Sequence, residues 1–68
     1  MNGAVKSYDA RRGLGFIIPD NGGVDIAVYS SELESAGFPR LASGERLSFD
    51  VKIDRALGRT FAVNLCRV

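Results

Sequence analysis

Four Phe and two Tyr side chains, together with nine Lys and Arg residues, are the groups in this chain best suited to recognition chemistry. An exposed aromatic ring can stack on another flat ring. Lys and Arg pair with anions such as phosphate, and the planar Arg guanidinium also stacks on rings. The formal net charge is only +1, so the overall charge does not by itself indicate a polyanionic partner. Evidence for any partner must therefore come from where these residues lie.

The chain has no histidine and a single cysteine, Cys66. These two absences remove the commonest general base, the commonest metal ligand and every Ser-His or Cys-His nucleophile pair. Carboxylate pairs and a Ser-Lys pair remain, but the acidic residues fall mostly at turns and alternating strand positions. We therefore expect no catalysis, no metal site and no cofactor. Because Cys66 has no partner for a disulfide within the chain, we expect a reducing, cytoplasmic setting.

A chain of 68 residues is long enough for one domain, and it has no apolar stretch of about 18 residues that could span a membrane. Short apolar runs separated by turn signals predict a small all-β fold. The clearest turn signal is Asn21-Gly22, the strongest short-range indication of a β-hairpin, because both residues tolerate positive φ. The strands are expected at residues 4–8, 14–18, 24–29, 46–53 and 61–65.

The last two expected strands alternate apolar and polar residues, which predicts one buried face on each. On the fourth strand this face comprises Leu47, Phe49, Val51 and Ile53. On the fifth strand Phe61 alternates with Val63 and Leu65, so we expect Phe61 in the core.

The segment from residue 30 to residue 44 differs from the rest. Ser31 is followed three residues later by Glu34, a capping-box pattern that predicts one helical turn, and Gly37 is placed to end it. Residues 38–44 are then expected to form a long loop. Five short strands with one long connection after the third predict an all-β, five-stranded antiparallel Greek-key barrel.

Two segments resemble the beginning of bacterial cold-shock proteins. Asn2-Gly3-Ala4-Val5-Lys6 is similar to the family's N-G-x-V-K, and Arg12-Gly13-Leu14-Gly15-Phe16-Ile17 to its K-G-F/Y-G-F-I. The segment from Asp25 to Ser31 occupies the place of D-V-F-V-H-F-S. The likeness keeps the order and spacing of its landmarks along the whole chain. It implies a single cold-shock-like domain at residues 1–68 with an OB-like barrel.

The resemblance also implies where bases would stack. Family members carry an aromatic platform on their first three strands, bordered by basic side chains. Phe16 and Phe38 match the family's rings directly, while Tyr8 and Tyr29 replace its Phe and His. Four platform positions lack the family's ring in this chain: Ser7, Leu14, Ala27 and Ser30.

Charged residues complete the expected site. Lys6 and Arg12 match basic positions of the family, and Asp25 matches an acid that can accept hydrogen bonds from a base edge. Arg59 is a further cation available for phosphates. The predicted nucleic-acid-binding residues are Lys6, Tyr8, Arg12, Leu14, Phe16, Asp25, Tyr29, Phe38 and Arg59.

The direction of each ring decides what it can do. If Ile17 points to the core, Phe16 points outward, because neighbours on a strand face opposite ways. Tyr29 is expected outward on the adjacent strand, and the competing interpretation is a buried ring with a satisfied hydroxyl. Phe38 is either a mobile stacking clamp or an anchor for its loop. The first expected strand is too short for the alternation of apolar and polar residues to show which way Tyr8 points.

The leading hypothesis is a protein that binds single-stranded RNA or DNA, and the resemblance implies an RNA chaperone or a regulator of transcription or translation under stress. Base stacking on an aromatic ring is worth about 1–3 kcal/mol, so the missing rings predict weaker binding than in full-platform members. The alternative is a protein–protein interaction module on the same fold, since fold does not settle function. We expect a monomer, with a homodimer as the other possibility.

Overall fold

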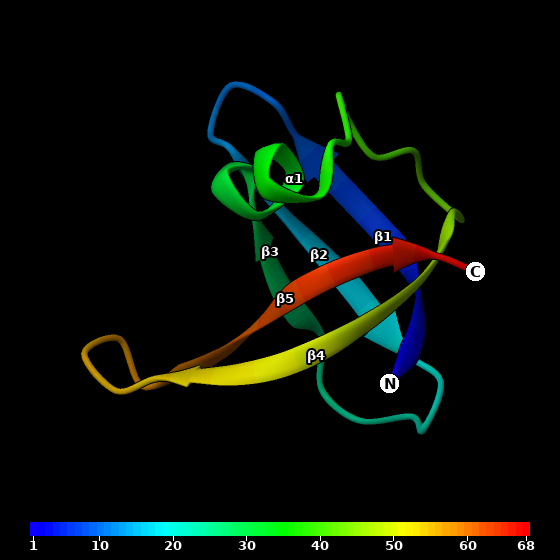
Figure 1. The fold of residues 1–68 in the computed structure, drawn as a ribbon. Coiled ribbons are helices and arrows are strands. Elements are labelled where there is room, and N and C mark those ends of the chain that lie inside the picture. Colours follow the sequence, from blue (N-terminus) through cyan, green and yellow to red (C-terminus); the bar gives the residue numbers. More distant parts are fainter.

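Five strands and one short helix make up the computed structural model, which describes residues 1–68 (Figure 1). The elements are β1 (Asn2–Asp9), β2 (Leu14–Pro19), β3 (Ile26–Tyr29), α1 (Ser30–Ala36), β4 (Arg46–Asp54) and β5 (Arg59–Arg67). The expected number and order of strands are confirmed. β3 begins at Ile26, because Val24 and Asp25 belong to the connection from β2 and not to the sheet. No helix has the length or the apolar character needed to cross a membrane.

The sheet closes on itself in the order β1-β2-β3-β5-β4. Four of its neighbouring pairs are antiparallel: β1–β2, β2–β3, β4–β5 and the closing pair β1–β4. The fifth pair, β3–β5, is parallel and matches Ala27 to Phe61. The long connection through α1 carries the chain across the end of the barrel before the β4–β5 hairpin begins (Figure 1). This crossing is what lets β5 lie beside β3, as a Greek-key barrel requires.

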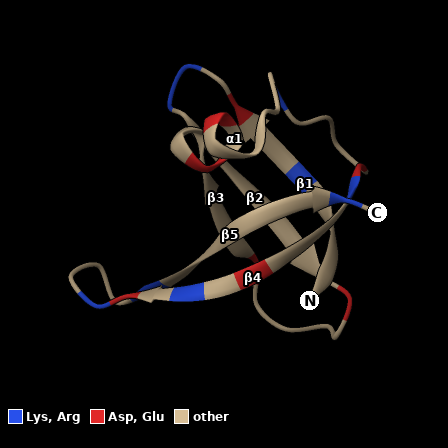
Figure 2. Ribbon diagram, in the orientation of Figure 1, with Lys and Arg blue, Asp and Glu red and all other residues tan.

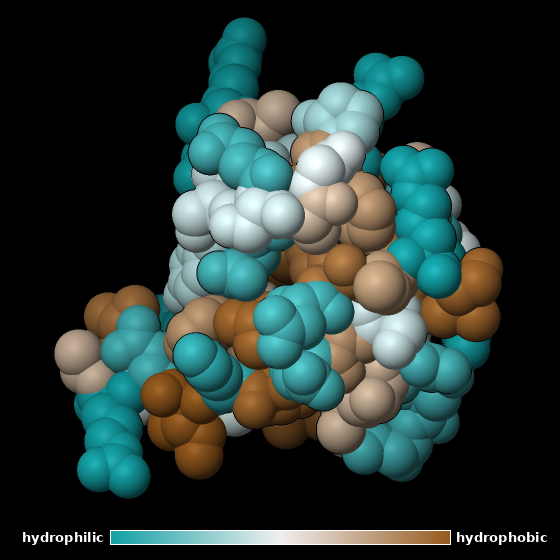
Figure 3. All heavy atoms as spheres, in the orientation of Figure 1, coloured by the Kyte–Doolittle hydropathy of each residue, from teal (hydrophilic) through white to brown (hydrophobic).

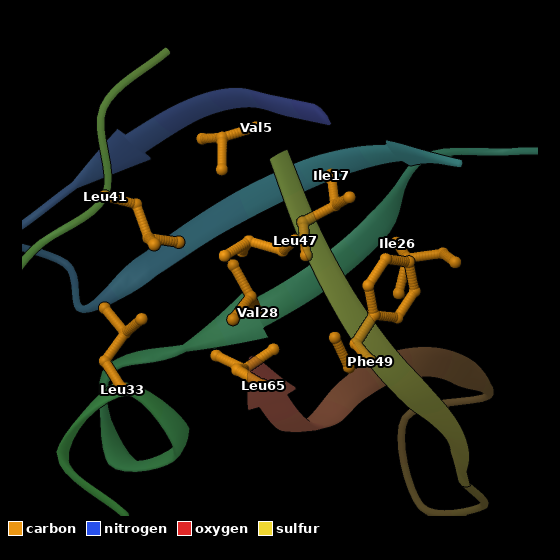
Figure 4. Close-up of a cluster of buried hydrophobic side chains, with 10 residues drawn as sticks. Val5, Ile17, Ile26, Val28, Leu33, Leu41, Leu47, Phe49 and Leu65 are labelled. Carbon is orange, nitrogen blue, oxygen red and sulfur yellow. The ribbon is translucent and has the colours of Figure 1, made fainter. Parts of the chain in front are cut away.

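The core gathers side chains from every strand and from α1 (Figure 4). Phe49 is its largest fully buried side chain, and Leu33 of α1 covers one end of the barrel. The buried cluster comprises Val5, Ile17, Ile26, Val28, Leu33, Leu41, Leu47, Phe49, Ala62 and Leu65. Burial of these apolar side chains away from water stabilises the fold.

The expected buried face of β4 is correct only for its first half. Leu47 and Phe49 lie in the core, but Val51 is 37% exposed and Ile53 is 71% exposed. The β4–β5 hairpin continues beyond the rest of the barrel, so its far half has no opposite wall to pack against (Figure 1). Alternation predicts which side chains share a face, but the extent of the neighbouring strands decides whether that face is covered.

The prediction that Phe61 belongs to the core is wrong. Val63 and Leu65 are buried as expected, but Ala62 is buried as well, so the alternation is interrupted in this part of β5. Asn64 adopts a positive φ of 53°, and the pairing with β4 shifts between Ser48 and Asp50. This local bulge, which adds a residue to one strand, places Phe61 on the outer face instead.

The helix confirms the predicted end and corrects the predicted beginning. Gly37 has φ 81° and closes α1, with its amide donating to the Glu34 carbonyl at 3.2 Å. The capping box at Ser31 is not formed, because β3 runs directly into the helix and Tyr29 occupies the N-cap without a side-chain hydrogen bond. The Ser30 amide donates instead to the Gly13 carbonyl, 2.9 Å away in the β1–β2 turn.

An ion pair ties the β2–β3 connection to the start of β4. The Arg46 guanidinium donates to both carboxylate oxygens of Asp20, with Nη1 at 2.8 Å from Oδ1. This hydrogen bonding lowers the pKa of Asp20 below its ordinary value of 3.8, against a weaker opposing effect of desolvation.

The lowered pKa predicts a pH dependence of stability. A carboxyl group whose pKa is lower in the folded state stabilises the fold above its ordinary pKa, and this contribution is lost as the pH falls through the folded-state value. The urea midpoint of the wild type should therefore exceed that of Asp20→Asn above about pH 5, and the gap should narrow below about pH 4. Urea titrations from neutral to acid pH measure the gap. A constant gap throughout would contradict the role of Asp20.

Candidate nucleic-acid interface

The outer face of β2 and β3 carries the first part of the candidate site. Ile17 is fully buried in the core, and Phe16 therefore points to the opposite face, as its place in the alternation predicts. Phe16 is partly exposed and lies opposite Ala27 of β3. Leu14 lies on the same face, opposite Tyr29.

Phe61 adds a ring to this face that the sequence analysis missed. It lies beside Ala27 in the parallel pair of β3 and β5, and its ring centroid is 5.7 Å from that of Tyr29, with the two planes inclined at 58°. Phe16 and Phe61 therefore flank the small side chain of Ala27 from the two neighbouring strands. The only signal in the sequence was Asn64, a residue type that tolerates the positive φ of a bulge.

Tyr29 matches neither of its two expected states fully. Its ring is partly exposed, but its hydroxyl is buried and has no hydrogen-bond partner. The ring therefore contributes to the edge of the outer face through its packing on Phe61.

A groove of about 480 Å³ opens where the outer face meets the projecting hairpin. Phe16 and Ala27 contribute from the barrel, Ile53 and Thr60 from the hairpin, and Asp25 from the β2–β3 connection. Its complete lining is Phe16, Val24, Asp25, Ala27, Ile53, Gly58, Arg59 and Thr60. The space-filling view shows apolar side chains exposed among polar ones over the β4–β5 hairpin (Figure 3).

A bulge in β1 places a cation beside the groove. The register of β1 with β2 passes from Val5 to Ser7, which leaves Lys6 as the extra residue. Bulges re-aim side chains in this way. The Lys6 Nζ atom donates to Asp25 Oδ2 at 2.9 Å, and both side chains are solvent-accessible. The pair therefore presents a donor next to an acceptor at the edge of the groove.

The remaining cations are spread over the turns and the hairpin (Figure 2). Arg59 lines the groove, is exposed and forms no ion pair, so its guanidinium is free for an anion. Arg12 lies in the β1–β2 turn with its side chain 81% exposed, and its Nε is 3.8 Å from Asp9 Oδ2. An exposed pair at this distance holds Arg12 only weakly.

Two of the expected ring residues face the core and not the groove. Tyr8 is paired with Gly15, whose missing side chain leaves room for the Tyr8 ring, and it packs against the core cluster. Phe38 also packs against the core, and the Arg67 guanidinium lies 5.0 Å above its ring. The structure supports the second interpretation of Phe38, in which its ring anchors the loop on the barrel.

The structure thus brings six of the nine expected residues to one side of the barrel. They are Lys6, Leu14, Phe16, Asp25, Tyr29 and Arg59. Arg12 lies in the turn before Leu14, while Tyr8 and Phe38 pack on the core. A concave face with aromatic rings, a carboxylate and a free guanidinium has the groups needed to stack a planar ring, read its edge and bind an anion.

A closed five-stranded barrel of this topology, with aromatic rings on one outer face and cations at the edges of that face, is typical of the class of OB-like barrels. Residues 1–68 match the family described as the 'Cold-shock' DNA-binding domain. The chain belongs to the cold-shock domain family, and the resemblance found in its sequence is confirmed.

Similar proteins occur in bacteria and plants. The chain is 41% identical over 63 residues to the probable cold shock protein y4cH of Sinorhizobium fredii, covering 93% of this chain and 91% of that protein. It is 38% identical over 64 residues to the cold shock protein CspA of Rhizobium meliloti, covering 94% and 93%. It is 43% identical over 63 residues to cold shock domain-containing protein 4 of Arabidopsis thaliana, of which it spans only 31%.

Proposed function

We propose that this protein binds single-stranded RNA or DNA on the outer face of β2, β3 and β5, as an RNA chaperone or a regulator of transcription or translation in the cytoplasm. The observation that carries the proposal is Phe16, which lies on the outer face and borders a groove that also contains Asp25 and Arg59. Membership of a family described as a DNA-binding domain supports it. The proposed activity is binding by a monomer, without catalysis or a cofactor.

Affinity is expected to be lower than in members with a full aromatic platform. Leu14 and Ala27 occupy the outer face opposite Tyr29 and Phe16, and neither can stack on a base as a ring does. Each stacked base is worth about 1–3 kcal/mol, and about 1.4 kcal/mol corresponds to a factor of ten in affinity. Phe61 restores part of the lost ring surface, so the deficit should be smaller than the four replaced positions alone imply.

Salt dependence tests the proposed binding directly. We expect fluorescent oligo-U and oligo-dT of seven nucleotides to bind saturably, with three or four phosphate contacts made by cations such as Lys6, Arg12 and Arg59. A plot of log K against log salt concentration should then have a slope of about −2 to −3 for single strands. Anisotropy titrations at several salt concentrations measure it. Absence of saturable binding into the high micromolar range at low salt would exclude the proposal.

The second candidate is a surface for a protein partner. It is favoured by the exposed apolar side chains of Val24 and Ile53, which line the groove, and of Leu57 in the turn of the β4–β5 hairpin. Exposed apolar side chains that cluster mark interaction sites. Binding of such a partner should depend only weakly on salt and should be insensitive to competing oligonucleotide, which distinguishes it from the first candidate.

A further inference from the structure

One row of side chains crosses four strands of the closed sheet. Phe16 of β2 lies opposite Ala27 of β3, and Ala27 is matched to Phe61 of β5. Phe61 in turn lies opposite Lys52 of β4. Residues that are paired in this way point to the same side of a sheet, so the whole row lies on the outer face. Because neighbouring strands are about 4.8 Å apart, the backbones of Phe16 and Phe61 are separated by about 10 Å. The row therefore leaves β2 and β3 and continues onto the β4–β5 hairpin (Figure 1).

Two apolar residues on the outer face are buried without belonging to the core. Ala27 is 4% exposed and Val63 is 6% exposed, yet neither is part of the core cluster. Their chain neighbours Ile26 and Ala62 do belong to that cluster, so Ala27 and Val63 point to the opposite side. Side chains of the outer face must therefore cover them. The Phe61 ring is placed to do so, because it is matched to Ala27 and lies two residues before Val63 on the same strand.

This packing holds the Phe61 ring in place while part of it stays exposed. The ring also packs on Tyr29, with the two centroids 5.7 Å apart. Phe61 is nevertheless only partly buried. A ring that is already fixed loses little conformational entropy when a flat group stacks on it. Phe61 can therefore receive a base without rearrangement of the sheet.

Two cations without ion-pair partners flank this ring. Lys52 lies directly opposite Phe61, and the Cβ atoms of such a cross-strand pair are about 5 Å apart. Arg59 precedes Phe61 by two residues on β5 and so points to the same side. Both cationic side chains are exposed, and neither forms an ion pair. An exposed ring beside free cations has the composition of a nucleotide site, because the ring stacks on the base and a cation binds the phosphate.

The acidic side chains next to Lys52 have other partners. Asp50 and Asp54 lie two residues before and after Lys52 on β4. Asp50 Oδ2 accepts a hydrogen bond from Asn64 Nδ2 at 2.9 Å. Asp54 Oδ1 accepts from two amides of the hairpin turn, at 3.0 and 3.2 Å. Neither carboxylate pairs with Lys52, so its ammonium group is available to an anion.

We propose that Phe61 and Lys52 form a nucleotide subsite on the β4–β5 hairpin, in which one base of a bound single strand stacks on Phe61 and its phosphate pairs with Lys52. This inference rests on the proposed function and extends its site to a fourth strand of the sheet. Neither residue lies on the first three strands, where the resemblance places the aromatic platform. A nucleic-acid strand that also contacts Phe16 then crosses β3 along the row.

Phe61→Leu tests the ring of this subsite. Leu keeps an apolar side chain against Tyr29 but cannot stack on a base. Labelled oligo-U of seven nucleotides should therefore bind about fivefold more weakly, the lower end of the loss of one stacked base, because Tyr29 covers part of the ring. Anisotropy titrations at low salt measure the change, and circular dichroism checks that the variant is folded. Unchanged affinity in the folded variant would overturn the subsite and leave the proposed function intact, whereas failure of the wild type to bind would overturn both.

Lys52→Gln tests the phosphate contact at an exposed position, which keeps the proposal testable if Phe61→Leu does not fold. Loss of one contact should reduce the magnitude of the slope of log K against log salt concentration by about 0.7. Arg55→Gln is the matched control, because it removes the same charge from the hairpin turn, where the Arg55 side chain is exposed and forms no ion pair. Its slope should equal that of the wild type. Equal reductions for the two variants would show that the hairpin attracts nucleic acid only through its overall charge, against the assignment to Lys52.

The double variant shows whether the two side chains hold the same nucleotide. When no base is held on Phe61, its phosphate is no longer positioned at Lys52. Lys52→Gln should therefore weaken binding much less in the Phe61→Leu background than in the wild type. Two fold-changes that simply multiply would contradict a shared subsite.

Free uridine monophosphate offers the same base and phosphate as one nucleotide of the strand, and it separates the two sources of this chemistry. The other contacts of the strand raise the effective concentration of its nucleotides at the subsite. The free nucleotide should therefore displace labelled oligo-U only at much higher concentration. Displacement at concentrations similar to the dissociation constant of oligo-U would overturn the assignment to a strand.

Discussion

Phe49→Ala is expected to leave most molecules unfolded at 25 °C. Phe49 is 2% exposed and is the largest fully buried side chain of the core. Truncating a buried Phe to Ala costs about 3–5 kcal/mol, because the lost transfer free energy is accompanied by a cavity. A domain of this size has a net stability of only about 3–5 kcal/mol. Far-UV circular dichroism and urea denaturation of the purified variant measure the outcome.

Phe61→Ala provides the matched comparison for this prediction. Phe61 is also on the β4–β5 hairpin, but it is partly exposed on the outer face and packs on Tyr29. Phe61→Ala should therefore lower the free energy of unfolding much less than Phe49→Ala does. Loss of the aromatic pair with Tyr29 accounts for about 0.5–1.5 kcal/mol of this decrease. Equal losses for the two variants would contradict the outer position of Phe61 and support the simple alternation of β5.

The succession of strands and turns along the chain could be predicted, because it depends on local signals. Asn21-Gly22 marks the β2–β3 connection, and Gly37 ends α1 at the left-handed position that glycine adopts readily. The alternation of Leu47 and Phe49 also identifies their face correctly. It fails at Val51 and Ile53, because the length of the hairpin relative to the barrel is a property of the tertiary fold.

The site could be predicted only in part for the same reason. The direction of Phe16 follows from the burial of Ile17, its neighbour on one short strand. The groove was not predictable, because it joins Asp25 of the β2–β3 connection to Arg59 at the start of β5, which lie far apart in the sequence. Phe61 was misplaced because a bulge changes the face of a residue without leaving a reliable mark on the hydrophobic pattern.

Phe16→Ala is expected to cause the largest loss of single-strand affinity of any truncation on the outer face. Phe16 is partly exposed, borders the groove and lies opposite a small residue, so its ring face is accessible to a base. Loss of one stacking ring is worth about 1–3 kcal/mol, which corresponds to a factor of about 5 to 150 in the dissociation constant. Anisotropy titrations with oligo-U measure the change, and the urea midpoint should fall only slightly.

Phe38→Ala separates this effect from a general response to losing an aromatic ring. Phe38 packs against the core beneath Arg67, and its amide donates to the Leu33 carbonyl at 2.8 Å. Its truncation should therefore lower the urea midpoint more than Phe16→Ala does and weaken oligonucleotide binding less. In the opposite result, Phe38→Ala would lose oligonucleotide binding and Phe16→Ala would retain it. That result would mean that the loop carrying Phe38 leaves the core when an oligonucleotide binds. The binding face would then be the family's platform with its clamp, and not the groove beside the hairpin.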